Sequence, residues 1–410
     1  MLSWVNRFNI CSFLDNHLYQ SGNTNLECLA ACGSIAQTTD NPKFAELDAF
    51  LQQQKGNWIF GHIGYDNKNQ VETLSSIHPD AIQFPDLFFF VPAVVLKLQY
   101  DKLEISCYDQ SNPEEIYREI ISVLPVEPAK TSSLKIESRL SRNEYIQIIQ
   151  QLKQHILRGD CYEINYCQEF YATDIQIDPV SLYQQLTAIS PNPFACYYKH
   201  ESRHLLCASP ERFLQKKGSR LISQPIKGTI QRNLLNQEAD TLLLEELKAS
   251  EKDKSENVMV VDLVRNDLSK VCKEGSVKVS ELFGIYSFPQ VHQMISTIEG
   301  ELDENVPFSS ILKACFPMGS MTGAPKKRVM ELIEQYEKTK RGLYSGAVGY
   351  IDPNGDFDFN VVIRSILYNA ANQYLGYQVG GGITFYSDPE KEYEECLLKA
   401  AAIRKVLQVE

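Results

Sequence analysis

The clearest hydrophobic pattern of the chain lies just after its first third. Apolar residues recur at helical spacing over residues 145–156. Ser141 and Glu144 form a capping-box pair before this stripe, and Gly159 follows it as a helix stop signal. The pattern predicts a helix over residues 142–158.

The rest of the chain mixes helical and strand-like patterns. Further helices are expected over residues 237–270, from residues 324–325 onward, and over 387–408. Short apolar runs typical of strands occur at residues 58–60, 87–91, 94–98, 162–170, 204–208 and 220–223. Because helices and strands do not alternate regularly, we expect an α+β fold with mostly antiparallel sheets, not a doubly wound fold.

One segment separates regions of different pattern. Residues 124–133 are rich in Pro, Ser and Lys and carry little periodicity. We therefore expect an N-terminal subregion over residues 1–125 and a larger catalytic region over residues 135–410.

Composition narrows the class of protein. The chain has 410 residues, a net charge of −12 and 43% hydrophobic residues, which excludes disordered and collagen-like proteins and provides no basic field for nucleic acid or an anionic membrane surface. No apolar run approaches the roughly 20 residues of a membrane helix, so we expect a cytoplasmic protein. Its 11 cysteines include no CxxC pair, which favours reduced thiols over a disulfide framework or a zinc site.

Acidic side chains gather on two predicted helices. Glu392, Glu395 and Lys399 share one helix face. This face is open to two interpretations: a solvated surface with an i, i+4 ion pair, or part of a cation site. Glu256 begins a second helical segment whose apolar run, residues 258–261, indicates burial. Buried carboxylates from two helices without matching cations favour a hard divalent ion such as Mg²⁺.

Lys227 and Glu211 are candidates for covalent and acid chemistry. Lys227 lies between Pro225 and Gly228, which predicts a short turn that could present it to a pocket or leave it exposed on a loop. Its amine is a nucleophile if its pKa is lowered. Glu211 follows a strand that is expected to be buried, and desolvation would make its carboxyl group a proton donor.

Two glycine-containing segments complete the candidates. Residues 317–326 run into a predicted helix N-terminus, where free backbone N–H groups favour an anion. Residues 380–383 form a Gly-Gly-Gly-Ile loop through which a ligand could approach the backbone closely. Tight turns explain both segments equally well.

Seven motifs together resemble one family. They are SPERFL (209–214), PIKGT (225–229), ENVMVVDLVRNDL (256–268), PMGSMTGAPK (317–326), YSGAVGY (344–350), VGGGI (379–383) and DPEKEYEECLLKA (388–400). In this order they are similar to the chorismate-utilising enzymes, which include anthranilate synthase component I, aminodeoxychorismate synthase component I, isochorismate synthase and salicylate synthase. The resemblance is strong over residues 141–407 and weaker before them.

The resemblance implies a fold and a set of site residues. The family fold packs two antiparallel sheets orthogonally inside a layer of helices, with the N-terminal third in the same body. By resemblance, Mg²⁺ would be bound by Glu256 and Glu395, with Glu392 and Asp253 nearby. Chorismate would be held by Arg364, Tyr344 and Lys399 and by the backbone of Gly346, Gly381 and Gly382, with Thr322 and His292 also in the pocket.

The same resemblance favours one branch of the family. Enzymes that add water to the ring carry a Lys where this chain has Glu163, whereas the aminodeoxychorismate branch often has Lys at the position of Lys227. We therefore expect chorismate amination for the folate branch, with anthranilate synthesis as the alternative. Glu163 and Glu169 stand where the amine-adding branches commonly have Gln and Arg, which either alters the charge of the pocket or reflects drift.

The implied mechanism is covalent. Lys227 would attack the ring while Glu211 protonates the leaving hydroxyl group, and ammonia would then displace Lys227. The ammonia is expected from a separate glutamine amidotransferase subunit. A catalytically silent binding protein that retains the fold is a third hypothesis, which the presence of Glu211, Lys227, Glu256 and Glu395 disfavours.

Overall fold

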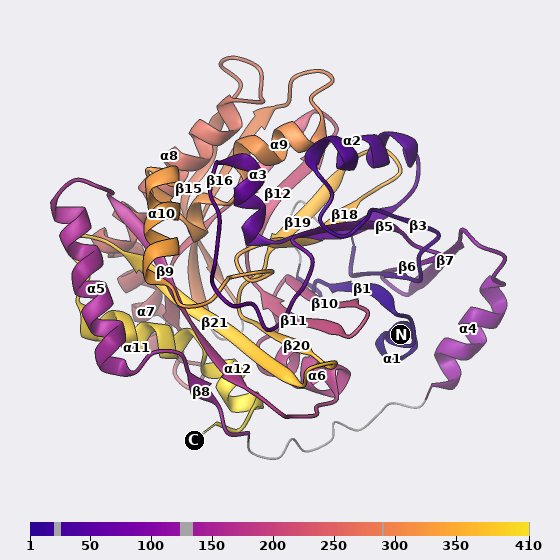
Figure 1. Cartoon of the computed structure of the whole chain (residues 1–410), viewed down its shortest axis with the longest axis horizontal. Coiled ribbons are helices and arrows are strands. Elements are labelled where there is room, and N and C mark those ends of the chain that lie inside the picture. Colours follow the sequence, from indigo (N-terminus) through magenta and orange to yellow (C-terminus); the bar gives the residue numbers. More distant parts are fainter. Residues whose placement is uncertain (20–25, 124–133, 289–290, 410) are drawn as a thin grey trace.

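Two antiparallel sheets form the centre of the molecule, and helices lie around them (Figure 1). The computed structural model describes residues 1–19, 26–123, 134–288 and 291–409. The expected α+β class with antiparallel sheets is confirmed. The expected linker over residues 124–133 lies outside the described residues.

The first sheet has 11 strands and draws on both ends of the chain. In spatial order it contains β17 (Gly323–Ala324), β9 (Glu163–Ala172), β21 (Tyr374–Ile383), β20 (Ser365–Asn369), β11 (Arg203–Ser209), β10 (Phe194–His200), β1 (Ile10–Asp15), β2 (Cys28–Cys32), β6 (Val94–Gln99) and β7 (Lys102–Cys107), with β8 (Glu137–Ser138) beside β9.

The second sheet has 10 strands. It contains, in order, β14 (Ile226–Gln231), β16 (Val291–Glu301), β13 (Arg220–Gln224), β12 (Arg212–Lys217), β19 (Phe357–Val361), β18 (Ala347–Ile351), β4 (Ile59–Ile63), β5 (Leu87–Val91) and β3 (Ala36–Gln37), with β15 (Lys278–Ser287) beside β16.

Helices lie around these sheets. They are α1 (Leu2–Val5), α2 (Phe44–Gln53), α3 (Lys68–Val71), α4 (Pro113–Ser122), α5 (Arg142–Leu157), α6 (Pro179–Ile189), α7 (Gln237–Ala249), α8 (Glu251–Ser269), α9 (Phe308–Cys315), α10 (Lys326–Tyr336), α11 (Pro389–Lys399) and α12 (Ala401–Val406), with 3-10 turns η1 (Tyr65–Asn67) and η2 (Gly319–Met321). Within the described ranges, no helix combines the length and apolarity that a bilayer crossing requires.

The predicted helices form where local signals are strong. Helix α5 begins after Ser141, whose side chain accepts from the backbone N–H of Glu144 while Glu144 caps the Ser141 N–H in return. The pattern over residues 237–270 is two helices, because Ser250 ends α7 and caps α8. On α8, Val260 and Val261 are buried as expected, but Val258 is 41% exposed.

Strand alternation explains how the first sheet is covered on both faces. Leu29 and Ala31 of β2 belong to a core shared with strands of the second sheet and with α8 and α9. Ala30, between them, belongs to a second core, formed with α5, α6, α10 and α12. The first sheet is therefore the middle layer, with the second sheet on one face and helices on the other.

The N-terminal third contributes to both sheets. Strand β1 pairs with β10 in the first sheet, and β4 pairs with β18 in the second. The boundary between residues 125 and 135 stays a prediction, since the segment around it is not described.

Candidate active site

A cavity of about 890 Å³ lies between β14, at the edge of the second sheet, and the neighbouring strands β9 and β21 of the first sheet, and residues of α8 and α11 also line it. Nine of the predicted site residues line it: Glu211, Lys227, Asp253, Glu256, Tyr344, Arg364, Gly382, Glu395 and Lys399. Its volume suits a small organic ligand.

Lys227 lies at the junction of the two sheets. The expected turn at Lys227 is wrong: it lies in strand β14, which follows β13 after Pro225, and both strands pair with β16. Gly228, with φ of +92°, lies at the register shift between β14 and β16. Lys227 is buried, which excludes the exposed-loop interpretation.

A carboxylate from the first sheet meets this amine. The Nζ of Lys227 donates a hydrogen bond to Oε1 of Glu163, the first residue of β9, over 2.5 Å. Burial lowers the pKa of Lys227, but Glu163, together with Glu256 and Glu211, outweighs this effect and raises the pKa above its ordinary value. A lowered pKa of Lys227 is therefore not found in this structure.

Glu211 has the opposite electrostatic balance. Its side chain is buried at the end of β11, and this burial raises its pKa to about 7, although a hydrogen bond from Ser320 and the charge of Lys227 act in the other direction. A carboxyl group with this pKa is protonated in part at neutral pH. Glu211 is thus able to act as a proton donor inside the cavity.

The triple glycine lies in a strand, not in the expected loop. Residues 380–382 belong to β21 and pair with β9. A Cβ atom on Gly382 would stand 2.5 Å from Oε1 of Glu163 and 2.8 Å from Nζ of Lys227. Glycine at this position therefore leaves the space that the Lys227–Glu163 pair occupies.

Three carboxylates converge between α8 and α11. The Nζ of Lys252 lies 3.9 Å from Glu256, 3.5 Å from Glu392 and 3.9 Å from Glu395. The expectation that these carboxylates lack matching cations is wrong, because Lys252 is placed four residues before Glu256 on the same face of α8.

The last helix carries the expected ion pair. Lys399 Nζ lies 2.9 Å from Oε1 of Glu395 and also donates to the carbonyl oxygen of Gly380. The positive charge of Lys399 is the largest effect on Glu395 and lowers its pKa to about 2. Glu392, one turn earlier, is 3% exposed, so this helix face is not simply solvated.

These groups were tested for a divalent cation. Among the described residues, no group of three or more His, Cys, Asp or Glu side chains is arranged to hold a metal ion. However, Oε1 of Glu256 is buried without a hydrogen-bond partner, burial raises the pKa of Glu256 to about 7, and all the converging ligand atoms are oxygens. The donor set fits Mg²⁺ once the Lys252 ammonium moves aside.

Arg364 provides a positive charge in the cavity. It has a φ of +51° and lines the cavity beside Tyr344. Burial lowers its pKa. No ion pair to Arg364 occurs in the part of the chain that the structure describes, so its guanidinium is available for an anionic ligand.

The remaining predicted site residues do not line the cavity. Thr322 is buried and donates to the carbonyl of Met318. The others are Gly346, Gly381, His292 and Glu392. His292 lies in β16, and its ring contacts Asp240 of α7 and Ser287 of β15. The N-terminus of α10, expected as an anion site, is also outside the residues that line the cavity.

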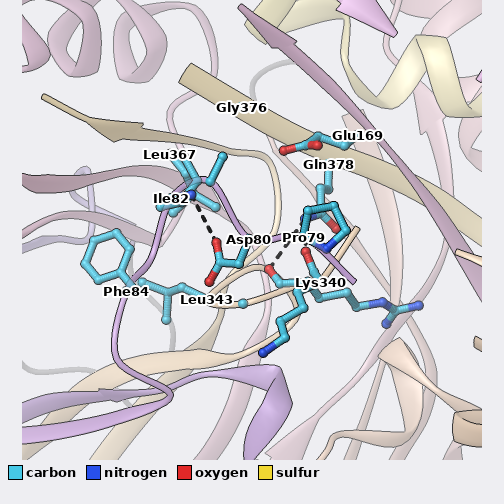
Figure 2. Close-up of a pocket in the computed structure, with 13 residues that line it drawn as sticks. Pro79, Asp80, Ile82, Phe84, Glu169, Lys340, Leu343, Leu367, Gly376 and Gln378 are labelled. Atoms are coloured by element: carbon cyan, nitrogen blue, oxygen red, sulfur yellow. Dashed lines mark hydrogen bonds between the residues drawn. The ribbon is translucent and has the colours of Figure 1, made fainter. Parts of the chain in front are cut away.

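Glu169 does not alter the charge of this cavity. It lies beside a separate enclosed cavity of about 10 Å³, near Asp80, Gly376 and Gln378 (Figure 2). There its carboxylate receives a hydrogen bond from Arg139 Nε over 2.8 Å and another from the hydroxyl group of Tyr374. Glu163 and Glu169 are the two residues of β9 that differ from those common in the amine-adding branches, and only Glu163 contacts a candidate catalytic residue.

The model of the chorismate binding enzyme family matches residues 15–405. The chain belongs to the chorismate-binding enzymes. It is 33% identical over 363 residues to aminodeoxychorismate synthase component 1 of Bacillus subtilis, covering 85% of this chain and 76% of the relative. The protein of the same name from Escherichia coli is 35% identical over 350 residues, again with 85% and 76% covered.

A solved structure supports the fold of this chorismate-binding enzyme. The crystal structure of anthranilate synthase component I from Streptococcus pneumoniae superposes with a TM-score of 0.79 at 25% identity, covering 95% of this chain and 94% of that one. The agreement extends over both sheets and so includes the N-terminal strands.

The sequence analysis missed one charged residue of this chorismate-binding site, Lys252, and one ion pair, Lys227–Glu163. Lys252 could have been found, because its i, i+4 spacing to Glu256 is a local signal. The pairing of Glu163 with Lys227 could not, since the two residues are 64 positions apart and lie in different sheets.

Proposed function

We propose that this chorismate-binding enzyme converts chorismate and ammonia into 4-amino-4-deoxychorismate, the precursor of 4-aminobenzoate and folate. The observation that carries the proposal is the buried Lys227 beside Glu211, a carboxyl group whose pKa is raised to about 7. The two relatives that are named aminodeoxychorismate synthase component 1 support this proposal.

The reaction proceeds through a covalent adduct. The amine of Lys227 attacks the ring carbon next to the carboxylated one, the double bonds shift, and the bond from the para carbon to its hydroxyl group breaks. Glu211 protonates the departing hydroxyl, which leaves as water. Ammonia then adds at the para carbon, the double bonds shift back, and Lys227 leaves as an amine.

Charged residues orient the substrate dianion. The guanidinium of Arg364 binds one carboxylate of the substrate. Tyr344 and Lys399, which also line the cavity, contribute further hydrogen-bond donors. Glu256 and Glu395, with Glu392 and Asp253 nearby, would hold a Mg²⁺ ion, whose chemistry is to neutralise and fix the ring carboxylate.

We also propose a partner and a compartment. The relatives are named component 1, which supports a second, ammonia-supplying glutamine amidotransferase subunit. Glutamine-dependent product formation after addition of that subunit would test this pairing. All 11 cysteines are free thiols, which favours a reducing compartment such as the cytoplasm and is checked by cell fractionation.

The deciding experiment is product analysis with the purified chain. It is incubated with chorismate, Mg²⁺ and an ammonium salt at mildly alkaline pH, with and without aminodeoxychorismate lyase. We expect 4-aminobenzoate only with the lyase. Formation of anthranilate and pyruvate would instead assign the enzyme to the anthranilate branch. If chorismate is not consumed, the hypothesis of a catalytically silent binding protein would be supported.

The role of Lys227 is tested by substitution. Lys227→Ala should lose the amination, and without ammonia the wild-type chain should gain on Lys227 the mass of chorismate less one water. The matched control is Lys216→Ala, which removes a partly exposed lysine of β12 that pairs with Asp356 far from the cavity lining. A fully active Lys227→Ala variant would exclude the covalent route.

A further inference from the structure

The Lys227–Glu163 pair is buried at the wall of the cavity. Glu163 is 2% and Lys227 8% exposed, and their atoms Oε1 and Nζ are 2.5 Å apart. The second carboxylate oxygen of Glu163, Oε2, is buried and has no hydrogen-bond partner among the described residues. Glu163 therefore directs its hydrogen-bonding capacity at Lys227 alone.

This geometry raises a chemical problem for a nucleophilic lysine. A protonated amine has no lone pair, so Lys227 must release a proton before it attacks carbon. Glu163 is the hydrogen-bond acceptor in contact with Nζ. The other acidic groups that face Lys227 come from three elements and lie beyond ion-pair distance in the described structure: Glu211 after β11, Asp253 and Glu256 on α8, and Glu395 on α11.

We propose that Glu163 takes the proton from Lys227 and so produces the free amine at the wall of the cavity. One N–H bond of Lys227 breaks, one O–H bond forms on Glu163, and the proton returns when Lys227 leaves the adduct as an amine. This inference rests on the proposed function and adds a residue to it.

The geometry permits such an internal transfer. Moving the proton over 2.5 Å converts a buried ion pair into two neutral groups, which removes the cost of keeping two charges out of water. Gly382 keeps the path clear, because a Cβ atom there would lie within 2.8 Å of both partners. The local fold thus brings the donor and the acceptor together with nothing between them.

The proposal has a signature in the pH dependence. The pair holds one shared proton over a broad pH range, so the fraction of free amine does not change with pH. In Glu163→Gln the proton must leave to the solvent, and the free-amine fraction rises about tenfold for each pH unit below the pKa of Lys227.

The experiment compares kcat/KM of Glu163→Gln with that of the wild type from pH 6.5 to 9. The ratio of the two values cancels the titration of Glu211, which both proteins share. We expect the ratio of variant to wild type to rise about tenfold per pH unit below the pKa of Lys227 in the variant, which the loss of Glu163 lowers, and to level off above that pKa. Glu163→Asp keeps a carboxylate and should give a ratio that is independent of pH. The matched control is Glu169→Gln, which removes a carboxylate from the same strand at a distance from the cavity lining.

A second measurement does not depend on chorismate. Acetic anhydride labels free amines, and mass spectrometry follows the labelled fraction of Lys227 relative to the exposed lysines. After correction for the pH dependence of the reagent itself, we expect the labelled fraction of Lys227 in the wild type to stay constant between pH 7 and 9. In Glu163→Gln the labelled fraction should rise about tenfold per pH unit below the pKa of Lys227.

The outcomes separate the two proposals. A pH-independent ratio for Glu163→Gln, or a wild-type Lys227 whose labelling rises tenfold per pH unit, overturns the role of Glu163. Flat wild-type labelling in a chain that does not aminate chorismate supports the proton transfer and overturns the proposed function instead. If Glu163→Gln does not fold, the wild-type labelling and Glu163→Asp still decide.

Discussion

Glu211 owes its proposed role to burial, and this gives a pH prediction. Its folded-state pKa is raised to about 7, so it is protonated below that pH and loses its proton above it. Since a proton donor must be protonated, kcat/KM of the wild type should fall as pH rises through about 7. A pH–rate profile from pH 5.5 to 9 measures this limb.

The assignment of that limb is checked by substitution. Glu211→Gln should lose about 10²- to 10⁴-fold in kcat and no longer show the falling limb. Glu201→Gln, which removes an exposed carboxylate in the turn after β10, should keep both rate and limb. A Glu211→Gln variant with the wild-type profile would assign the limb to another group.

Gly382 allows a second prediction at the residue scale. Gly382→Ala places a methyl group 2.5 Å from Glu163 and 2.8 Å from Lys227, so the pair must separate. We expect kcat to fall about 100-fold with little change in the melting temperature. Gly381→Ala is the comparison, because its nearest contact is 3.3 Å, and it should lose much less activity. Equal losses in both variants would contradict the geometry.

The residues show what a sequence allows one to predict. Lys227 and Glu211 were identified because each stands in a short, recognisable motif, and both line the cavity. The protonation state of Lys227 was not predictable, since it depends on Glu163, which comes from another sheet. His292 was expected in the pocket, but it does not line the cavity, and its ring contacts Asp240 of α7.

At the scale of elements, α5 owes its start to its capping box. Ser141→Ala removes the side-chain acceptor of the Glu144 N–H and should lower the free energy of unfolding by ~1 kcal/mol. Ser141→Asp keeps an acceptor and should lose only a few tenths of that. Urea unfolding of the three proteins measures the difference, and an equally stable Ser141→Ala variant would show that packing alone holds the helix end.

Helices α8 and α11 predict a competition between Lys252 and Mg²⁺. The Lys252 ammonium lies within 3.9 Å of three carboxylates that are proposed to bind or surround the ion. Lys252→Gln removes the competing charge and should lower the Mg²⁺ concentration for half-maximal activity about threefold or more. Activity after chelation, titrated with Mg²⁺, measures this shift.

The same helix offers the control. Lys254→Gln removes a lysine that pairs with the exposed Glu251, and it should leave the Mg²⁺ titration unchanged. If Lys252→Gln raises the required Mg²⁺ concentration instead, Lys252 assists the ligand and does not compete with the ion.

Element prediction succeeded where signals are local and failed where pairing is distant. The apolar stripes of α5 and α10 and the Asp388-Pro389 start of α11 are local signals, and these helices form. The single helix expected over residues 387–408 is instead two helices, α11 and α12, on either side of Ala400. Residues 380–382 were expected as a loop in which the absence of side chains lets a ligand approach the backbone. They are a strand because β9, more than 200 residues earlier in the chain, supplies the pairing partner.

At the scale of the whole molecule, the N-terminal third completes both sheets. Without residues 1–123, β10 would lose β1 and β18 would lose β4, which exposes an edge in each sheet. We expect residues 134–410 alone to aggregate or to lack cooperative unfolding, measured by light scattering and calorimetry. A stable, monomeric fragment would instead support a separate domain after residue 134.

Those strand pairings also determine when the N-terminal strands can pair during translation. Strand β4 cannot meet β18 until about 280 further residues have been made, which takes roughly 15–60 s at the speed of a ribosome. During this time the apolar strands β4 and β5 can pair only with each other and with the short strand β3. The nascent chain therefore exposes apolar strands, which chaperones bind, during most of its synthesis. The yield of folded protein in cells should depend on chaperones more strongly than the stability of the folded protein suggests.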